Sequence, residues 1–487
     1  LHASSHAMDG VMATEKAPEN LRVETIAVGT SAEAINRLIA RAAAGTVLEF
    51  AAGTHSLSAP LLIKRDAITL RGSQHAKTKL QFVDPTRDFI AVQGTTSRHL
   101  IRLKADATAG DRSIEVDGAG AIKPGQMIAL KQPNSRAFIA ENGWTNVTWT
   151  EAKNRPFRES LHRVVAIEGA TLSLATPLPF AYQAGTATAH VATPRTKITL
   201  ADLTITTDLG PADPNIFSNT LPAASRHSAL RLRWSDGVAL KRLTFKDMPS
   251  TAVALQSALA SNLETIHIDG AHNKGGLGNG YGLELKEAFD TVAKDLTILG
   301  MRHAVIFSAW HAEIGNHIHV SRTDRDINFH GSLDHGNTVL VDEIILAYAA
   351  DRSRKRRRNV WPVLSPGGTN HARTAFLTDN TVRIKRGVGS WRDDVLIGDP
   401  KGAELAGGFG NDVFVVHGPT TLLDFEAQDL LHLPGTRRAL RWIENGADTL
   451  LMVQNGPTVR FKDRALSNID PSRIVFEKAD PRLNLGS

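Results

Sequence analysis

The fold of this chain is decided by six short stretches that resemble one another: ADLTI (Ala201–Ile205), KRLTF (Lys241–Phe245), ETIHI (Glu264–Ile268), KDLTI (Lys294–Ile298), NHIHV (Asn316–Val320) and NTVLV (Asn337–Val341). Their central apolar residue recurs about every 22 residues, with longer gaps after the first and third stretches. An interval of this size is typical of stacked supersecondary units, in which each repeat is one coil of a solenoid.

A second series of apolar residues precedes the first by half a repeat. Its members are Leu232, Leu255, Leu285, Phe307 and Phe329. Apolar and polar residues alternate around each of them, and this alternation is typical of half-buried strands. Two or three short strands per repeat, without heptads or long helices, predict an all-β fold built as a parallel β-helix. The rival fold is a leucine-rich repeat, whose asparagine and leucine consensus is absent.

The start of the chain predicts a capping helix. Thr30 and Glu33 form a T-x-x-E capping box, apolar residues follow at helical spacing, and Gly45 is expected to end the helix. The strings AAGTH (Ala51–His55) and ITLRGS (Ile68–Ser73) come next. Together these features resemble the pectate-lyase-like superfamily over roughly residues 25–345, and the resemblance implies a right-handed β-helix with an N-terminal capping helix.

Composition narrows the possible partners. The chain has 487 residues, no cysteine and a net charge of +6. The absence of cysteine excludes disulfides, thiol catalysis and cysteine–zinc sites. A basic balance favours a polyanionic partner. Because no nucleic-acid-binding motif is recognisable, we expect an acidic polysaccharide rather than nucleic acid. There is no apolar run of 18 residues, so we expect no transmembrane helix and no membrane partner, and we expect a monomer.

The expected organisation has four parts. Residues 1–20 are polar and read as a disordered arm or a cloning remnant; 21–350 form the β-helix, with a β insertion at about 95–190; 351–385 form a basic connector; and 386–487 form a β-roll with C-terminal strands. Within the insertion, Trp144 and Trp149 fit either a surface loop or a groove wall that stacks on sugar rings. The basic run 352–358 reads as a solvated connector or as a hold on a polyanion.

The C-terminal part carries the most specific motif. Gly407–Val415 reads GGFGNDVFV and fits the nonapeptide G-G-x-G-x-D-x-U-x of calcium-binding RTX repeats. Asp394 occupies the same position two repeats before Asp412. Carboxylate and carbonyl oxygens suit Ca²⁺. We therefore expect about one calcium site, which would use Asp394 and Asp412 with backbone carbonyls near Gly389, Arg392, Gly407 and Gly410. The alternative is a glycine-rich turn without metal.

The segment after this motif, Thr420–Gly435, resembles the strand pair that commonly follows RTX repeats. The resemblance implies a secreted, extracellular protein exported through a bacterial type I system, with calcium-triggered folding.

The coil register predicts which side chains share a face. If the second apolar series points inward, its neighbours form two outward rows, one containing Arg231, Glu284 and Asn328, and the other Arg233, Lys286 and His330. The remaining candidates flank these rows: Tyr281, Arg302, His303, Trp310, His311, Arg325 and His335. The glycine-rich segment Gly275–Gly282 lengthens one coil here and is expected to overhang a groove.

Such a face suits β-elimination on a uronic acid polymer. A cation must neutralise the C6 carboxylate, a base must take the C5 proton, and an acid must protonate the leaving oxygen. We expect Lys286 or His330 as the base, Tyr281 or His303 as the acid or orienting group, and Arg233, Arg302 or Arg325 as carboxylate clamps. Arg231, Glu284, Asn328, His311, His335 and Trp310 complete the expected substrate-binding set.

The sequence thus favours a secreted polysaccharide lyase that acts on an acidic polysaccharide. Its modules resemble those of secreted lyases and mannuronan C5-epimerases, although the epimerase string Y-G-x-D-P-H is present only in fragments. Three alternatives stay open: a polyuronate C5-epimerase, a glycoside hydrolase, and a glycan-binding β-helix. A hydrolase needs a pair of carboxylates in the groove, and no clear pair is visible in the sequence.

Overall fold

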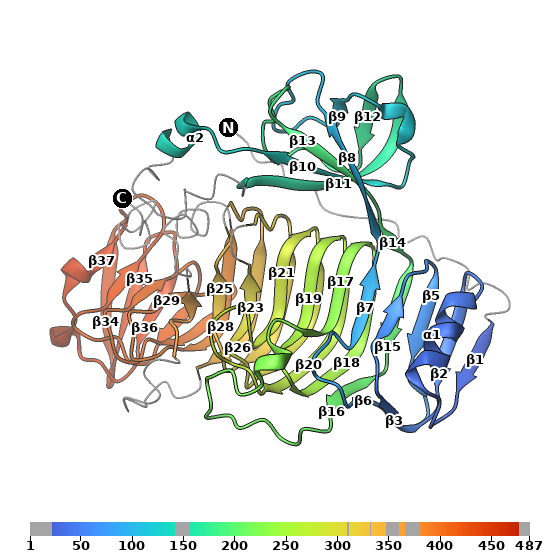
Figure 1. Ribbon diagram of the computed structural model, residues 1–487. Helices are drawn as coiled ribbons and strands as arrows, with labels where there is room; N and C mark the ends of the chain where they lie inside the picture. The colour runs from blue at the N-terminus through green and yellow to red at the C-terminus, as the bar shows by residue number, and fades with distance from the viewer. Residues whose placement is uncertain are drawn as a thin grey trace.

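The chain folds as a parallel β-helix with a second, smaller β domain inserted into it (Figure 1). The computed structural model describes residues 22–141, 156–308, 311–331, 333–346, 360–365 and 380–476. The predicted all-β, parallel β-helix class is confirmed. Trp144, Trp149, Trp310 and the basic run 352–358 lie outside the described residues. Among the described residues, no helix is long and apolar enough to cross a membrane.

Three sheets form the walls of the β-helix. The largest contains β1 (Val23–Ile26), β2 (Thr46–Phe50), β3 (Gly53–Leu57), β5 (Ile68–Arg71), β6 (Thr78–Phe82), β15 (Ile198–Ala201), β16 (Thr204–Thr207), β18 (Ala239–Met248), β20 (Asn262–Ala271), β22 (Val292–Leu299), β24 (His317–Thr323), β26 (Thr338–Ile345), β28 (Thr381–Val388), β30 (Ala403–Ala406), β32 (Thr420–Leu422), β34 (Leu440–Asn445), β35 (Asp448–Val453) and β36 (Thr458–Phe461). The second, called here the groove sheet, contains β4 (Leu61–Ile63), β7 (Ile90–Gln93), β14 (Arg195–Thr196), β17 (Ser228–Asp236), β19 (Thr251–Leu259), β21 (Tyr281–Phe289), β23 (His303–Phe307), β25 (Ile327–Phe329) and β27 (Leu364–Ser365). The third contains β29 (Val395–Ile397), β31 (Val413–Val415), β33 (Leu430–His432) and β37 (Ile474–Val475).

The groove sheet has the register that the sequence predicts. Leu232 pairs with Leu255, Leu255 with Leu285, Leu285 with Phe307, and Phe307 with Phe329. All five side chains are buried, and the last two rings stack with centroids 4.5 Å apart. Because side chains alternate across a strand, the residues between these apolar positions face outward together.

In the largest sheet, the pairing of the strands departs from the predicted pairing at one coil. Leu243 pairs with Ile266, and Ile266 with Leu296, as expected. Leu296 then pairs with Val320 instead of Ile318, because the register shifts on either side of Leu296. A bulge changes the pairing without changing which residues are apolar, so the alternation pattern does not reveal it.

The N-terminal helix begins one residue later than predicted. Helix α1 (Ala32–Arg41) has Ser31 as its N-cap, with the Ser31 hydroxyl accepting a hydrogen bond from the Ala34 N–H at 3.2 Å. Thr30 instead donates its hydroxyl to the Ala27 carbonyl at 2.7 Å. The helix also ends before Gly45, and its buried face packs into the core of the N-terminal coils (Figure 1).

The inserted domain is an antiparallel sheet that leaves the β-helix after β7 and returns at β14. Its strands are β8 (Thr95–Arg102), β9 (Ser113–Glu115), β10 (Met127–Gln132), β11 (Arg158–Glu168), β12 (Thr171–Leu174) and β13 (Thr188–Thr193). A short helix, α2 (Arg136–Glu141), follows β10. The domain has its own apolar core and stands over one side of the groove sheet (Figure 1).

The inserted domain is fixed to the β-helix by both apolar and charged contacts. Leu161 of β11 packs with Leu259 and Phe289 at the ends of two groove-sheet strands. Beside them, the Arg163 guanidinium donates two hydrogen bonds to the Asp236 carboxylate, each at 2.5 Å.

Ladders of polar side chains hold successive coils together at their turns. The Asn337 Oδ1 accepts a hydrogen bond from the Asn316 N–H at 3.0 Å, and the Asn380 Oδ1 accepts one from the Asn337 N–H at 3.1 Å. Asn337 also donates its side-chain amide to the Glu313 carbonyl at 2.7 Å. At the turns, these backbone groups have no partner within a sheet, and the asparagine side chains supply one. Asn316 and Asn337, which open NHIHV and NTVLV, therefore have a structural role.

Replacing one rung of this ladder should destabilise the fold. Asn337→Ala leaves the buried Asn316 N–H without an acceptor, so we expect the free energy of unfolding to fall by about 1–3 kcal/mol. Urea denaturation measures the change. The control is Asn445→Ala at an exposed position of β34, which should leave stability unchanged. Equal stability of both variants would contradict a structural role for the ladder.

Candidate functional site

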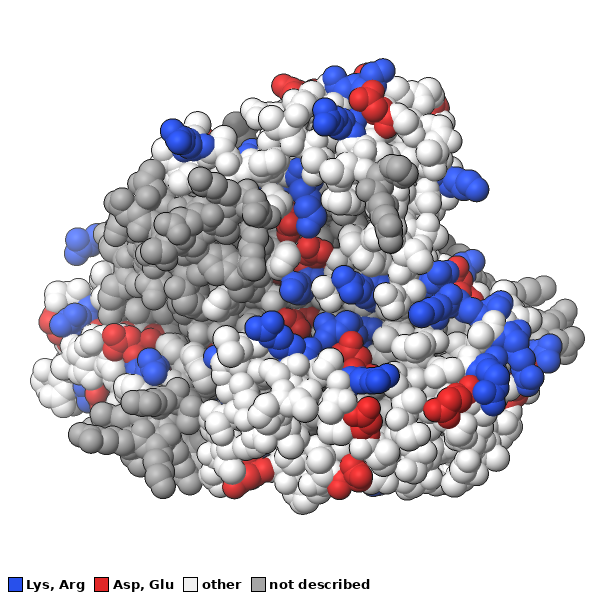
Figure 2. Space-filling model, viewed as in Figure 1, with Lys and Arg blue, Asp and Glu red and all other residues white. Residues whose placement is uncertain are grey.

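A groove of about 800 Å³ lies between the groove sheet and the inserted domain. It is lined by Lys131, Pro156, Glu159, Arg226, Arg231, Leu277, Gly278, Tyr281, Glu284, Lys286, Arg302, His303, Ile306, Ser308, His311 and His330. Basic side chains gather in the hollow beneath the inserted domain (Figure 2). Leu277 and Gly278 come from the glycine-rich segment, which therefore borders the groove.

The coil register brings most of the predicted site residues together. Eight of them line the groove: Tyr281, Glu284, Lys286, Arg302, His303, His311, His330 and Arg231. Arg233 is exposed on the same face, in line with Lys286 through Gln256. Their stacking follows the predicted rows, while their chemical roles stay predictions.

Besides Arg233, three predicted residues do not line the groove. Arg325 is buried, with its guanidinium 4.3 Å from the centre of the Phe217 ring. His335 packs on Phe180 with ring centroids 5.2 Å apart. Asn328 lies in the predicted row but is buried and donates to the Ser365 hydroxyl at 3.1 Å. The first two follow turns, where strand alternation no longer predicts the direction of a side chain.

A buried histidine–aspartate pair borders the groove. The Nδ1 atom of His303 lies 2.9 Å from each carboxylate oxygen of Asp326. Since a charged carboxylate only accepts hydrogen bonds, Nδ1 donates to Asp326, and in the neutral imidazole Nε2 is the atom with the lone pair. The Trp361 ring packs edge-on against the imidazole of His303, with the two ring centroids 4.6 Å apart, and this contact restricts rotation of the imidazole. This geometry prepares His303 to accept a proton at Nε2.

Tyr281 lies one coil before His303. The two residues are paired across β21 and β23, and their ring centroids are 5.7 Å apart. Burial raises the pKa of Tyr281 to about 12, although the nearby Arg302 charge opposes this. The phenol therefore stays protonated at neutral pH and can serve as a proton donor.

Cationic and neutral nitrogen groups surround this pair. Arg302 is held by a hydrogen bond from its Nη1 to the Gly275 carbonyl at 2.8 Å, and its guanidinium lies 5.3 Å from the centre of the Trp361 ring. Lys286 is half-buried on β21. Burial lowers the pKa of His330 to about 4, so this imidazole is neutral at neutral pH. The groove therefore offers fixed positive charge beside the protonated phenol of Tyr281 and the neutral imidazole of His330.

A charged cluster joins the inserted domain to the β-helix at the groove wall. Lys131 of β10 donates to Glu159 at 2.8 Å and to Glu287 at 3.1 Å. His311 lies 3.0 Å from Glu159 and 3.1 Å from Glu287. Burial alone would lower the pKa of Lys131, but the two carboxylates raise it to about 12. Hydrogen bonding from His311 and the charge of Lys131 outweigh burial and hold the pKa of Glu287 well below its usual range.

Three residues of this cluster could together hold a metal ion. Glu159, Glu287 and His311 each offer one ligand atom, and these atoms lie within 4.8 Å of one another. The Lys131 ammonium already bonds both carboxylates, so a cation is present in the cluster without a metal. Sequence patterns missed Lys131 and Glu159 because the inserted domain places them over β21 through tertiary packing alone.

The aspartates of the predicted calcium site form another ladder. The Asp412 Oδ1 accepts a hydrogen bond from the Asp394 N–H at 2.8 Å. The Asp394 carboxylate accepts from the Val363 N–H at 2.5 Å and from the Ser390 N–H at 2.7 Å. Asp429 continues the series by accepting from the Asp412 N–H at 3.0 Å. The two-repeat spacing of these aspartates therefore has a structural explanation that requires no metal.

The carbonyls named for calcium lie in the same turns. A Cβ atom on Gly410 would collide with the Arg392 carbonyl, and one on Gly389 would collide with the Gly407 carbonyl, which explains the glycines. Oxygen donors of the type that Ca²⁺ prefers are thus present, but the hydrogen-bond ladder already occupies the carboxylates. Calcium binding here stays a prediction.

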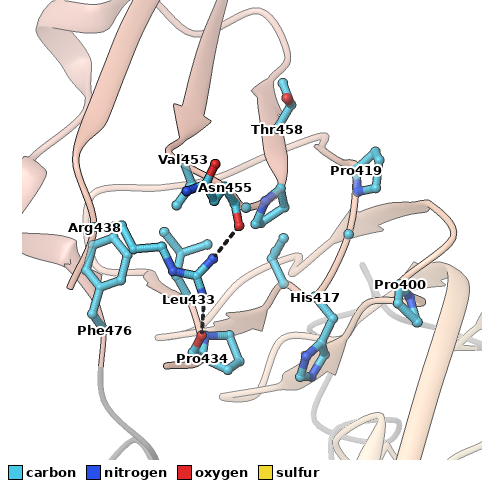
Figure 3. Close-up of a pocket in the computed structure, with 14 residues that line it drawn as sticks. Pro400, His417, Pro419, Leu433, Pro434, Arg438, Val453, Asn455, Thr458 and Phe476 are labelled. Atoms are coloured by element: carbon cyan, nitrogen blue, oxygen red, sulfur yellow. Dashed lines mark hydrogen bonds between the residues drawn. The ribbon is translucent and has the colours of Figure 1, made fainter. Parts of the chain in front are cut away.

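A separate pocket of about 490 Å³ lies near the C-terminus (Figure 3). Its walls come from turns rich in proline, and Arg438 crosses it to donate to the Asn455 carbonyl at 3.0 Å. Burial lowers the pKa of its His417 to about 4. Among the residues that the structure describes, no carboxylate lines this pocket, whereas the groove combines acids, bases and cations, so we take the groove as the site.

The fold and groove define a class: parallel β-helix proteins with a cationic groove on one sheet. No protein-family model and no curated protein matches the sequence. Solved structures share the fold at low identity. The tailspike of Pseudomonas phage phi297 is 12% identical, with 82% of this chain and 62% of that chain covered and a TM-score of 0.43. The tailspike of Acinetobacter baumannii bacteriophage AP22, solved in complex with capsular saccharide, is 10% identical, with coverages of 86% and 79% and a TM-score of 0.44.

An alginate lyase from a Paenibacillus species is 7% identical, with 84% of this chain and 93% of that chain covered and a TM-score of 0.27. At these identities and scores the likeness concerns the β-helix alone. The function of this chain must therefore be argued from its own groove.

Asp412→Asn separates the ladder from a calcium site. Burial raises the pKa of Asp412 to about 8, whereas an unfolded aspartate titrates near about 4. The folded protein therefore holds a proton that the unfolded chain releases, and this group's contribution to stability falls as pH rises between these values. The asparagine still accepts the Asp394 N–H but does not titrate. In EDTA, we compare the melting temperatures of the variant and of wild type. The difference, variant minus wild type, should increase by roughly a few degrees from pH 5 to pH 8.

Added Ca²⁺ completes this test. If Asp412 binds calcium, Ca²⁺ should stabilise wild type at pH 8 and leave Asp412→Asn unchanged. If the ladder is the whole role of the residue, Ca²⁺ should affect the two proteins alike. A melting difference that does not change with pH in EDTA would contradict the buried, protonated Asp412.

Proposed function

We propose that the protein is a polysaccharide lyase that cleaves an acidic, uronate-containing polysaccharide by β-elimination in the groove. The observation that carries this proposal is the orientation of His303 by Asp326, beside the neutral phenol of Tyr281 and the fixed cation of Arg302. These groups match the base, the acid and the electrostatic clamp that the reaction needs.

The steps follow from what each side chain can do. Arg302, which precedes His303 in the chain, neutralises the C6 carboxylate, and this makes the C5 proton more acidic. The Nε2 of His303 takes that proton, and the electron pair forms the C4–C5 double bond while the C4–O4 bond breaks. Tyr281 gives its proton to the departing O4 and then recovers a proton from His303. The sequence had grouped His303 with the acid; its contact with Asp326 favours it as the base.

The groove carboxylates support a lyase more than a hydrolase. A glycoside hydrolase needs one carboxyl group that stays protonated and can donate to the leaving oxygen. Glu287 is held in its charged form by Lys131 and His311, and Glu159 contacts the same two groups. Neither Glu159 nor Glu287 therefore suits the acid role. Asp326 is bound to His303, which leaves Glu284 as a single carboxylate on the groove floor instead of the pair that a hydrolase needs.

A C5-epimerase is the second candidate, and the same residues favour it. His303 and Tyr281 come from neighbouring coils and form two separate proton-transfer groups. If one removes the C5 proton and the other returns a proton to the opposite face, the sugar is inverted and the chain remains intact. The two reactions share their first step and differ in their product.

Export follows from the same proposal, because a polymer of this kind is met outside the cell. We propose secretion through a type I system on the resemblance of Gly407–Val415 to RTX repeats.

His303→Gln tests the proposed base. We expect kcat on a polyuronate substrate to fall by about a hundredfold to ten-thousandfold, because proton abstraction loses its positioned acceptor. Ultraviolet absorbance of the unsaturated product measures the rate. The matched control is His319→Gln on β24, because His319 also contacts an aspartate, Asp342, at 2.9 Å but lies outside the groove.

Tyr281→Phe should reduce the same rate by a similar factor and leave the fold intact. Full activity in both groove variants would overturn the assignment of the base and the acid. A panel of polyuronates that yields no unsaturated product but a changed proton NMR spectrum would favour the epimerase. New reducing ends without ultraviolet absorbance would favour a hydrolase.

A further inference from the structure

The pocket near the C-terminus carries positive charge without a negative partner on its walls. It holds about 490 Å³, within the range of roughly 300–1,000 Å³ that is usual for small-molecule sites. Among the residues that the structure describes, Arg438 and His417 line it, and no aspartate or glutamate does. In the described part of the chain, the pocket and the groove share no lining residue. The pocket is therefore a second, separate candidate for a binding site.

Arg438 supplies the charge. It lies just before β34, and its guanidinium donates to the Asn455 carbonyl at 3.0 Å and to the Pro434 carbonyl at 3.5 Å (Figure 3). Both partners are neutral carbonyl groups, so these bonds orient the guanidinium without neutralising it. A guanidinium has more N–H groups than these bonds use, and its fork of donors fits a carboxylate. Arg438 is thus held in place and still able to bind an anion.

His417 and the charges around it complete the polar part of the pocket. Burial, and after it the charge of Arg383, lower the pKa of His417 to about 4, so the imidazole is neutral at neutral pH. A neutral imidazole can donate one hydrogen bond and accept another. Asp399 precedes Pro400 of the pocket but does not line it; its carboxylate accepts from the Lys401 N–H at 2.8 Å, and its charge acts on Arg383. The partners of Asp399 therefore lie outside the pocket.

Apolar rings form most of the remaining wall. They belong to Phe476, which follows β37, and to prolines from separate loops: Pro400, Pro419, Pro434 and Pro457. Rigid rings lose little conformational entropy when a ligand packs on them. Asn455 and Thr458 are exposed at the same pocket and carry groups that can bond hydroxyls. The walls therefore suit a ligand with an apolar ring face, several hydroxyls and one negative charge.

We propose that this pocket binds an acidic sugar, a single pyranose unit with one carboxylate. Arg438 binds the carboxylate, His417 bonds a hydroxyl, and the proline and Phe476 rings pack on the face of the sugar. A phosphate monoester fits less well, because it carries about two negative charges at neutral pH and the neutral His417 adds no second cation. A free sugar acid and the end unit of an acidic polysaccharide share this chemistry. The inference goes beyond the proposed function, because binding here needs no residue of the groove.

Two sugars that differ only at C6 test this proposal. Methyl β-glucuronide and methyl β-glucoside are titrated calorimetrically, at millimolar concentrations, into the full-length protein. The glucuronide should bind about tenfold more tightly, because only its carboxylate pairs with Arg438. Acetate has the carboxylate but no ring, and it should also bind about tenfold more weakly than the glucuronide. No binding of the glucuronide, or equal binding of the glucoside or of acetate, would overturn the proposal.

Arg438→Gln locates the site. Loss of the guanidinium should weaken glucuronide binding about tenfold. The matched control is Arg441→Gln on β34, which removes the same charge at an exposed position outside the pocket and should bind as wild type does. The same titration of Arg302→Gln removes a groove cation instead. Loss of binding in Arg302→Gln, and not in Arg438→Gln, would assign the sugar to the groove and overturn the proposal.

A second pocket variant is needed because Arg438 also holds the turn at Asn455. His417→Phe leaves both bonds of Arg438 in place and removes the hydrogen bond to a sugar hydroxyl, so it should weaken glucuronide binding by about fivefold. Melting curves establish that each variant is folded. Unchanged binding in both folded pocket variants would contradict the proposed site.

A uronate hexasaccharide distinguishes the two sources of the sugar. If the end unit of a polysaccharide is the ligand, the hexasaccharide should bind at Arg438 at least as tightly as the glucuronide; much weaker binding would identify a free sugar acid. The outcome is separate from that of the proposed function. A protein that cleaves no polyuronate but loses glucuronide binding in Arg438→Gln would overturn the lyase and leave this inference standing.

Discussion

The in-register pairing of parallel strands between successive coils is the constraint on which the rest of the structure depends. Pairing fixes the distance between coils, and strand alternation fixes the face of each side chain. Together they place Tyr281 beside His303 and keep Gln256 between Arg233 and Lys286. The site is therefore a property of the register: a residue inserted within one groove strand would turn its later side chains to the opposite face.

Polar ladders extend the same constraint into the turns. The Asn316–Asn337–Asn380 series and the Asp394–Asp412–Asp429 series both use side-chain oxygens to accept N–H groups from the preceding coil. The aspartate version keeps acidic groups in a buried turn, and their pKa values rise as a result. The inserted domain then closes one side of the groove through a cluster of two glutamates, a lysine and a histidine, which joins the domains and contributes to the groove wall.

The fold and the floor of the groove could be predicted from the sequence because both follow from local periodicity. The alternation around Leu232, Leu255 and Leu285 was enough to place their polar neighbours in rows. Features set by tertiary packing could not be predicted. The bulge at Leu296 leaves no mark in the apolar pattern, Lys131 and Glu159 reach the groove on a separate domain, and Arg325 follows a turn that directs it into the protein. The sequence could have indicated Asp326, because it lies two residues before Asn328 and four before His330, and alternate residues of a strand share a face.

The central claim is that the coil register builds a site for an acidic glycan at His303 and Tyr281. A crystal structure of full-length His303→Gln with a bound uronate oligosaccharide tests it most directly. The account predicts a sugar chain parallel to the β-helix axis, with one C6 carboxylate at Arg302 and its C5 next to residue 303. An oligosaccharide seated only on the largest sheet or at the C-terminal pocket, or across the coils with its carboxylates away from Arg302, would contradict it.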